Sequence, residues 1–124
     1  MIKIKSIYWL DEASYEGEIT LVDSLNNQLV CFTDTIPIEH IESHLQVLSV
    51  ISDSDFIISS VKEYWLRNLG GFDYEIIGKV IDKDKLLVQC FEYIFSLDGP
   101  LPGDIVDGDW IEFKVSRVDI VEKL

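Results

Sequence analysis

An internal repeat runs through most of this 124-residue chain. Residues 74–91 match residues 15–32 at a constant offset of 59 positions with no gap; a Tyr-Glu pair opens both segments and a Cys-Phe pair closes both. A fixed spacing of this kind is typical of one supersecondary unit written twice. Two shorter matches flank these segments: Tyr8-Trp9-Leu10 with Tyr64-Trp65-Leu66, and Asp53-Ser54-Asp55-Phe56-Ile57 with Asp107-Gly108-Asp109-Trp110-Ile111.

We therefore predict one domain, residues 1–124, composed of two repeat units, residues 2–61 and residues 62–124. Apolar and polar residues alternate in both units and β-branched residues are frequent, which predicts antiparallel strands. The predicted fold class is mainly β with one short helix: an antiparallel small barrel or sandwich built from two tandem pseudo-symmetric meanders. A small barrel of the OB or SH3 type would leave few exposed sheet edges. Residues 56–66 are expected to form one long strand shared by both units.

The one predicted helix lies near residues 37–48, where four apolar residues recur at helical spacings of 3, 4 and 3. We expect Thr35 to cap this helix, and Pro37 suits a first helical turn. Residues 45–51 are also apolar enough to form a strand, so both interpretations stay open at that end. The four apolar residues are Ile38, Ile41, Leu45 and Leu48.

Acidic residues dominate the charge of the chain. The net charge is −13, and residues 6–61 contain ten Asp or Glu but no Lys or Arg. Binding to a phosphate backbone requires positive charge, so we predict no direct contact with nucleic acid. An anionic membrane surface would repel the chain, whereas a cationic protein would be attracted and would associate quickly. The alternative is that the acids only keep the protein in solution.

The sequence gives no sign of membrane insertion or secretion. No apolar run approaches the roughly 18 residues of a transmembrane helix. The N-terminal residues alternate Ile and Lys instead of forming the apolar block of a signal peptide. We therefore expect a cytoplasmic protein.

The repeated cysteines and tryptophans are expected to be core residues. Cys31 and Cys90 occupy equivalent positions, and a disulfide or redox pair across a pseudo-twofold axis is one interpretation. We favour two buried thiols acting as small hydrophobes, because cytosolic proteins rarely keep disulfides. Trp9 and Trp65 each precede a leucine, and we expect both to pack inside and not to anchor a partner.

His40 and His44 are the candidate metal ligands. Four residues apart, they would share one face of an α-helix, with Glu39 or Glu42 close by. The usual zinc helix also carries a Glu directly after its first His, and here Ile41 stands at that place. The chain has no third histidine, so we expect surface histidines, no metal and no cofactor.

No catalytic motif appears in the sequence. Neither cysteine is flanked by a His or by a cluster of Lys and Arg that would lower its pKa. There is no Gly-x-Ser-x-Gly elbow and no Gly-rich phosphate loop. We therefore expect a protein that is not an enzyme.

The acids divide into two groups. Those shared by both units, Asp23 with Asp82 and Asp53 with Asp107, are expected to shape turns, and the Asp-x-Asp pairs do not match a calcium loop. Acids without such a counterpart are predicted to form a partner-binding surface: Asp11, Glu12, Glu18, Glu39, Glu42 and Asp98.

The leading functional hypothesis is an acidic protein-binding module that neutralises a cationic protein. Its most concrete form is an immunity- or antitoxin-type inhibitor of a basic toxin nuclease, because a nuclease cleft must be positive to hold phosphates. One alternative is a structural or adaptor module that uses its sheet face within a larger complex. The other is a metal- or ligand-binding domain that uses His40 and His44.

Overall fold

The computed structural model describes residues 1–122, and its regular structure is mainly β-strand. Two short 3-10 helices interrupt them, η1 (Glu12–Ser14) and η2 (Ile38–His44). The strands are β1 (Lys3–Asp11), β2 (Glu16–Val22), β3 (Gln28–Thr33), β4 (Leu48–Ser52), β5 (Ile57–Ile58), β6 (Trp65–Gly70), β7 (Asp73–Asp82), β8 (Leu87–Cys90), β9 (Tyr93–Ser96) and β10 (Trp110–Ile120).

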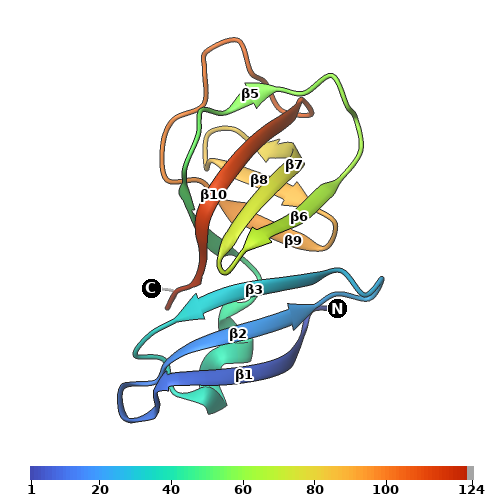
Figure 1. The fold of residues 1–124 in the computed structure, drawn as a ribbon. Coiled ribbons are helices and arrows are strands. Elements are labelled where there is room, and N and C mark those ends of the chain that lie inside the picture. Colours follow the sequence, from blue (N-terminus) through green and yellow to red (C-terminus); the bar gives the residue numbers. More distant parts are fainter. Residues whose placement is uncertain (123–124) are drawn as a thin grey trace.

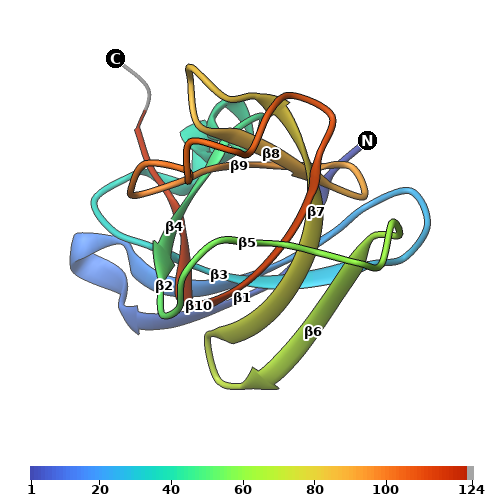
Figure 2. The same cartoon turned by 90° about the horizontal axis from the view of Figure 1, so that it is seen from above.

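Five strands close into a small barrel (Figures 1 and 2). They follow the order β10-β4-β9-β8-β7, and the ring closes because β7 also pairs with β10. The predicted fold class, mainly β with a small barrel, is confirmed. Most pairings are antiparallel, and the exceptions are β4 with β9 and β3 with β10.

The two repeat units form two three-stranded meanders, β1-β2-β3 and β6-β7-β8. Their second hairpins share one register: Leu21 pairs with Leu29, and 59 positions later Val80 pairs with Val88. The second meander contributes two strands to the barrel, whereas the first lies beside the barrel and joins it through the short parallel pairing of β3 with β10 (Figure 1).

The first hairpins of the two meanders differ by one position. Trp9 pairs with Gly17, but Trp65 pairs with Ile77, where a strict repeat would require residue 76. A shift of one residue turns a side chain to the other face of a sheet. Trp9 is therefore half-buried over Gly17, whereas Trp65 is 46% exposed. The expectation that both tryptophans pack inside is wrong for Trp65.

The predicted long strand over residues 56–66 is also wrong. Only Ile57 and Ile58 form a strand, and the chain then leaves the sheet until Trp65. Ser59 explains the break, because its Oγ accepts a hydrogen bond from the Val61 amide at 3.1 Å. A serine side chain that binds nearby backbone competes with the strand ladder in this way.

The predicted helix is present as η2, but in the tighter 3-10 form. Thr35 does not cap it; its φ is 67°, and the residue before the helix is Pro37, which has no capping side chain. The strand alternative for residues 45–51 holds in part, since β4 begins at Leu48. No helix within residues 1–122 is long and apolar enough to cross a membrane.

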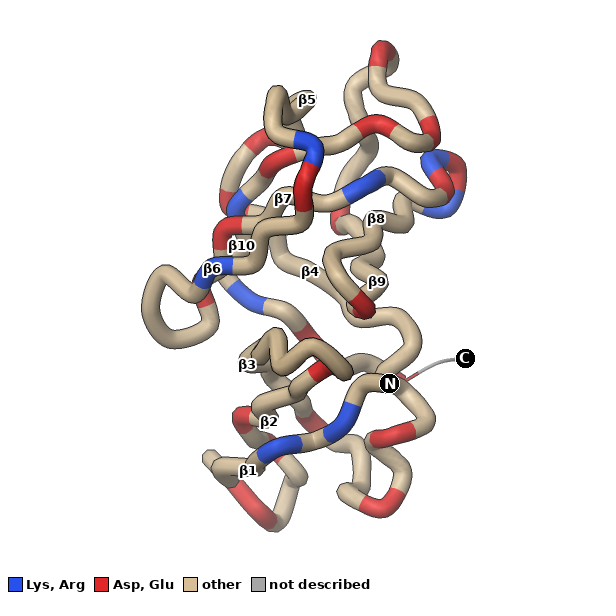
Figure 3. Tube along the Cα trace, turned by 90° about the vertical axis from the view of Figure 1, so that its right-hand side faces the viewer, with Lys and Arg blue, Asp and Glu red and all other residues tan. Residues whose placement is uncertain are grey.

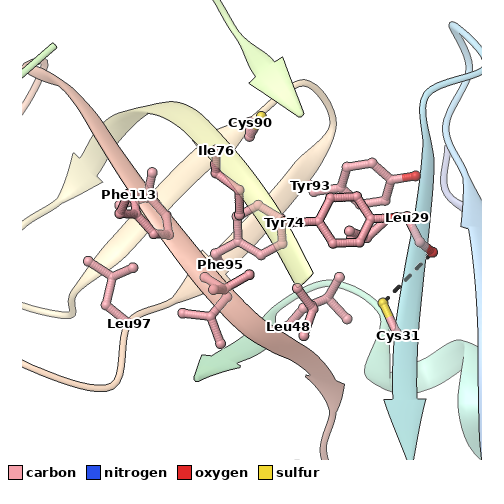
Figure 4. Packing of buried hydrophobic residues seen from close by; sticks show 14 of the residues in the cluster. Leu29, Cys31, Leu48, Tyr74, Ile76, Cys90, Tyr93, Phe95, Leu97 and Phe113 are labelled. Atoms are coloured by element: carbon pink, nitrogen blue, oxygen red, sulfur yellow. Dashed lines mark hydrogen bonds between the residues drawn. The ribbon is translucent and has the colours of Figure 1, made fainter. Parts of the chain in front are cut away.

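One hydrophobic core extends from the barrel into the space beneath the first meander (Figure 4). Tyr93 and Phe95 stack inside the barrel with ring centroids 6.3 Å apart, and both are fully buried. Leu29 and Cys31 bring the inner face of β3 to the same cluster, and Ile41 of η2 is also fully buried in it. The meander and the barrel are therefore parts of one packed body.

Candidate partner-binding surface

Eight of the ten acids in residues 6–61 lie in one part of the molecule, which we call the acidic lobe: β1, η1, β2, β3 and η2, residues 1–47. The lobe contains eight Asp or Glu, two Lys and no Arg. Figure 3 shows its red segments with blue only on β1, whereas red and blue alternate along the barrel strands. The acids are Asp11, Glu12, Glu16, Glu18, Asp23, Asp34, Glu39 and Glu42.

Three of the six predicted contact residues lie together at one end of this lobe. Asp11 ends β1, Glu12 begins η1, and both are exposed. Glu18 lies on β2 opposite Tyr8, and its side chain is half-buried on the outer face of the sheet. Asp11 also accepts a hydrogen bond from the Ala13 amide at 3.1 Å, so it shapes the turn as well as adding charge.

The other three predicted contact residues lie elsewhere. Glu39 and Glu42 are exposed on η2, which lies on the side of the lobe opposite the outer face of β1 to β3 (Figures 1 and 2). Asp98 lies in the barrel after β9, and its carboxylate accepts a hydrogen bond from the Ser52 amide at 2.8 Å. The predicted set is thus divided among three places, and Asp98 holds a loop to the end of β4.

Asp23 and Asp82, one of the two pairs of shared acids, do shape turns, as the repeat predicts. Asp23 is 5% exposed, and its Oδ1 accepts hydrogen bonds from the Leu25 and Asn27 amides at 3.0 and 2.8 Å. At the equivalent position Asp82 accepts one from the Lys85 amide at 3.1 Å. Such carboxylates satisfy local backbone groups and contribute little to a contact surface.

Two tyrosine hydroxyls of the barrel fix the position of the lobe. The Val30 amide donates a hydrogen bond to Tyr74 Oη at 2.9 Å, and Tyr93 Oη donates one to the Asn27 carbonyl at 2.5 Å. Burial is the main cause that raises the pKa of both phenols above their ordinary value of 10.0. Both hydroxyls therefore stay protonated, and the lobe keeps a defined orientation relative to the barrel.

Arg117 lies where the lobe meets the barrel. Its guanidinium binds both oxygens of Asp119, at 2.6 and 3.1 Å, and lies 4.3 Å from the centre of the Phe32 ring. Phe72, in the turn between β6 and β7, packs edge-on against Phe32. Because Arg117 is held by its own neighbours, it leaves the charge of the acidic lobe largely uncompensated.

A second surface, which the sequence reasoning missed, lies on the outside of the barrel. Four paired residues form one row across β5, β10, β7 and β6: Ile57, Glu112, Ile77 and Trp65. Side chains of directly paired residues point to the same face of a sheet. Ile57 is 52% exposed and Trp65 is 46% exposed, so apolar side chains stand on this face at both ends of the row.

An open pocket of about 320 Å³ adjoins this row. Carboxylates from three segments line it, Asp55, Glu75 and Glu112, together with Ile57 and Lys114. Ser59 fixes Glu112 through a hydrogen bond of 3.3 Å. We call the row and this pocket the barrel platform. The sequence signal for this platform is Trp65, which lies within the strand predicted over residues 56–66 and was expected to pack in the core.

The metal hypothesis finds no support in the geometry. A 3-10 helix has three residues per turn, so His40 and His44 of η2 project about 120° apart. Within residues 1–122, no group of three His, Cys, Asp or Glu side chains lies close enough together to hold a metal ion. The Asp-x-Asp pair at 107–109 serves turns instead: Asp107 accepts a hydrogen bond from Lys83 and Asp109 one from Val106.

Both cysteines are free, buried thiols. Burial raises the pKa of Cys31 far above its ordinary value of 9.0, and burial also raises the pKa of Cys90, to about 12. A thiol with a raised pKa is a poor nucleophile at neutral pH. Cys31 and Cys90 therefore serve as small hydrophobic side chains in the core, as expected.

Comparisons with known proteins give no relative from which to assign this surface: no family model, no curated protein and no solved structure matches the chain.

Proposed function

We propose that this protein is an acidic binding module that neutralises a cationic protein, most concretely an immunity- or antitoxin-type inhibitor of a basic toxin nuclease. The observation that supports the proposal is the separation of charge. The acidic lobe has eight carboxylates and two lysines, both lysines lie near the start of β1, and the nearest arginine is bound to Asp119.

The electrostatic field of the acidic lobe would act mainly on the rate at which a cationic partner associates. Long-range attraction between unlike charges raises the association rate and weakens as salt screens it. The two tyrosine hydrogen bonds hold the lobe in place, so the acids are presented on a preformed surface. Less conformational entropy is then lost on binding than for a disordered acidic segment.

The test is a binding measurement against basic toxin nucleases over a range of salt concentrations. We expect nanomolar affinity that weakens as salt rises, together with inhibition of nuclease activity. Because exposed charge pairs contribute about 0.2–1 kcal/mol each, the double variant Glu12→Gln, Glu18→Gln should slow association by about 2- to 30-fold. The absence of affinity for any cationic protein tested would end the proposal.

A matched control carries the same change of charge outside the lobe. Asp84 and Asp104 are exposed acids in barrel loops, so Asp84→Asn, Asp104→Asn removes the same two negative charges as the lobe variant. If this control slows association as much as the lobe variant does, the effect comes from net charge and not from the lobe. A third pair, Glu39→Gln, Glu42→Gln, shows whether the η2 side of the lobe takes part.

The adaptor alternative is favoured by one observation, the exposed apolar side chains of the barrel platform. An adaptor that binds through this face alone would have an affinity that does not respond to salt. The same salt series therefore separates the two functions.

A further inference from the structure

The barrel platform has the composition of a contact surface. Ile57 and Trp65 stand at the two ends of one cross-strand row, and Ile77 and Glu112 lie between them. Exposed tryptophan with aliphatic neighbours on one sheet face is typical of protein-binding sites, where tryptophan is enriched among the residues that dominate affinity.

The charge of the platform selects the partner. Three carboxylates, Asp55, Glu75 and Glu112, face the pocket with one ammonium group, Lys114. Lys114 of β10 and Arg67 of β6 are both paired with Glu75 of β7, whereas Glu112 has only Ile57 and Ile77 opposite it. None of these charged side chains forms an ion pair within 4.0 Å in the described part of the chain. An anionic partner would meet unpaired carboxylates here, whereas a cationic side chain would be stabilised.

We propose that the barrel platform docks the cationic partner protein and that its pocket receives one of the partner's arginine side chains. The inference rests on the proposed function and adds a second contact region to it. An arginine fits because its planar guanidinium can bridge carboxylates that come from different strands, and its methylene groups can lie along Ile57. Apolar residues of the partner would then cover Trp65.

The acidic lobe and the barrel platform are placed so that one large partner can contact both. The outer face of β1 to β3 and strand β6 lie on the same side, opposite η2 (Figures 1 and 2). Phe32 and Phe72 connect them, with ring centroids 6.1 Å apart. A partner that is steered by the lobe can therefore reach the barrel platform without turning around the molecule.

The test uses the full chain, labelled for NMR, and a hexa-arginine peptide as the probe. We expect amide shifts at Ile57, Glu112 and Lys114 that saturate with one dissociation constant. Glu112→Gln keeps the acceptor for Ser59 and removes one charge, and it should weaken peptide binding about two- to fivefold. Lys114→Gln removes the opposing charge and should tighten it by a similar factor. Asp84→Asn is the control and should leave the platform shifts unchanged.

The other outcomes overturn the inference, and they differ in what they say of the proposed function. Shifts confined to Asp11, Glu12 and Glu18 would remove the platform but leave the acidic module intact. Absence of any shift at low salt would remove both. Platform shifts that depend on protein concentration without peptide would show that a second copy of the chain covers this face.

Discussion

Removing the hydroxyl groups of Tyr74 and Tyr93 should loosen the acidic lobe from the barrel. β3 pairs with β10 at only two positions, Phe32 with Asp119 and Thr33 with Ile120. Further along β3 the barrel satisfies the backbone through these two phenols, at 2.9 Å to the Val30 amide and 2.5 Å to the Asn27 carbonyl. Phenylalanine keeps each ring and removes these two hydrogen bonds. The Val30 amide then loses its tyrosine partner, whereas the Asn27 carbonyl still accepts a hydrogen bond from the Asp23 amide at 3.2 Å.

The magnitude follows from what is left unpaired. A partly buried donor or acceptor that loses its partner costs about 1–3 kcal/mol. Because the Val30 contact is partly buried, we place Tyr74→Phe in the lower half of that range, about 1–2 kcal/mol. Tyr93→Phe should cost about 0.5–1.5 kcal/mol, the net contribution of one hydrogen bond, since the Asn27 carbonyl keeps the Asp23 amide. The double variant should lose about 1.5–3.5 kcal/mol if the two contacts act independently.

Urea unfolding measures the global loss, and amide hydrogen exchange measures the local one. The Val30 amide should exchange faster in Tyr74→Phe by more than the global change explains, because the hairpin can open on its own. Tyr8→Phe is the control, since Tyr8 is 66% exposed, and it should change stability by less than about 0.5 kcal/mol. If Tyr74→Phe unfolds at the wild-type urea concentration and Val30 keeps its protection, the two hydroxyls do not hold the lobe.

Two further predictions concern the barrel itself. A Cβ added at Gly78 would lie 2.6 Å from the Gln89 carbonyl oxygen, so Gly78→Ala should lower the free energy of unfolding in urea by about 1–3 kcal/mol or more. Gly103→Ala is the control and should change stability little, because there is open space around Gly103. Equal stabilities of the two variants would contradict the packing described. The folded chain keeps the proton of Cys90 up to a pKa of about 12, while the unfolded chain loses it near 9.0. The contribution of Cys90 to the free energy of unfolding should therefore be complete below pH 9, and it should fall by up to about 1.4 kcal/mol per pH unit above pH 9. Denaturant titrations should show a shallower fall in Cys90→Val.

Local patterns in the sequence predicted the strands and turns well. The constant offset predicted two like hairpins, and the paired Leu21–Leu29 and Val80–Val88 show the reason: both halves bury the same alternate positions. Asp23 and Asp82 recur because each satisfies the backbone of the turn that follows its strand. These features depend on residues close in sequence, and sequence patterns report such interactions directly.

The remaining features depend on tertiary pairing. Trp65 and Trp9 look equivalent in sequence, but one-residue differences in register send them to opposite faces. Asp55, Glu75 and Glu112 form one pocket only because β10 aligns with both β5 and β7. Asp98 is likewise separated from the other five predicted contact acids by the fold, because it lies in the barrel, where its carboxylate accepts a hydrogen bond from the Ser52 amide.

Strand β10 pairs with β3, β4, β5 and β7, and so it is the common neighbour of the lobe and the barrel. During synthesis on the ribosome, both meanders emerge before residues 110–120 do. Until those residues arrive, the inner edges of β3 and β7 have no strand to pair with, and unpaired edges invite association with other chains. Closure of the barrel therefore waits on β10, and the edges of β3 and β7 stay open to other chains until that strand is made.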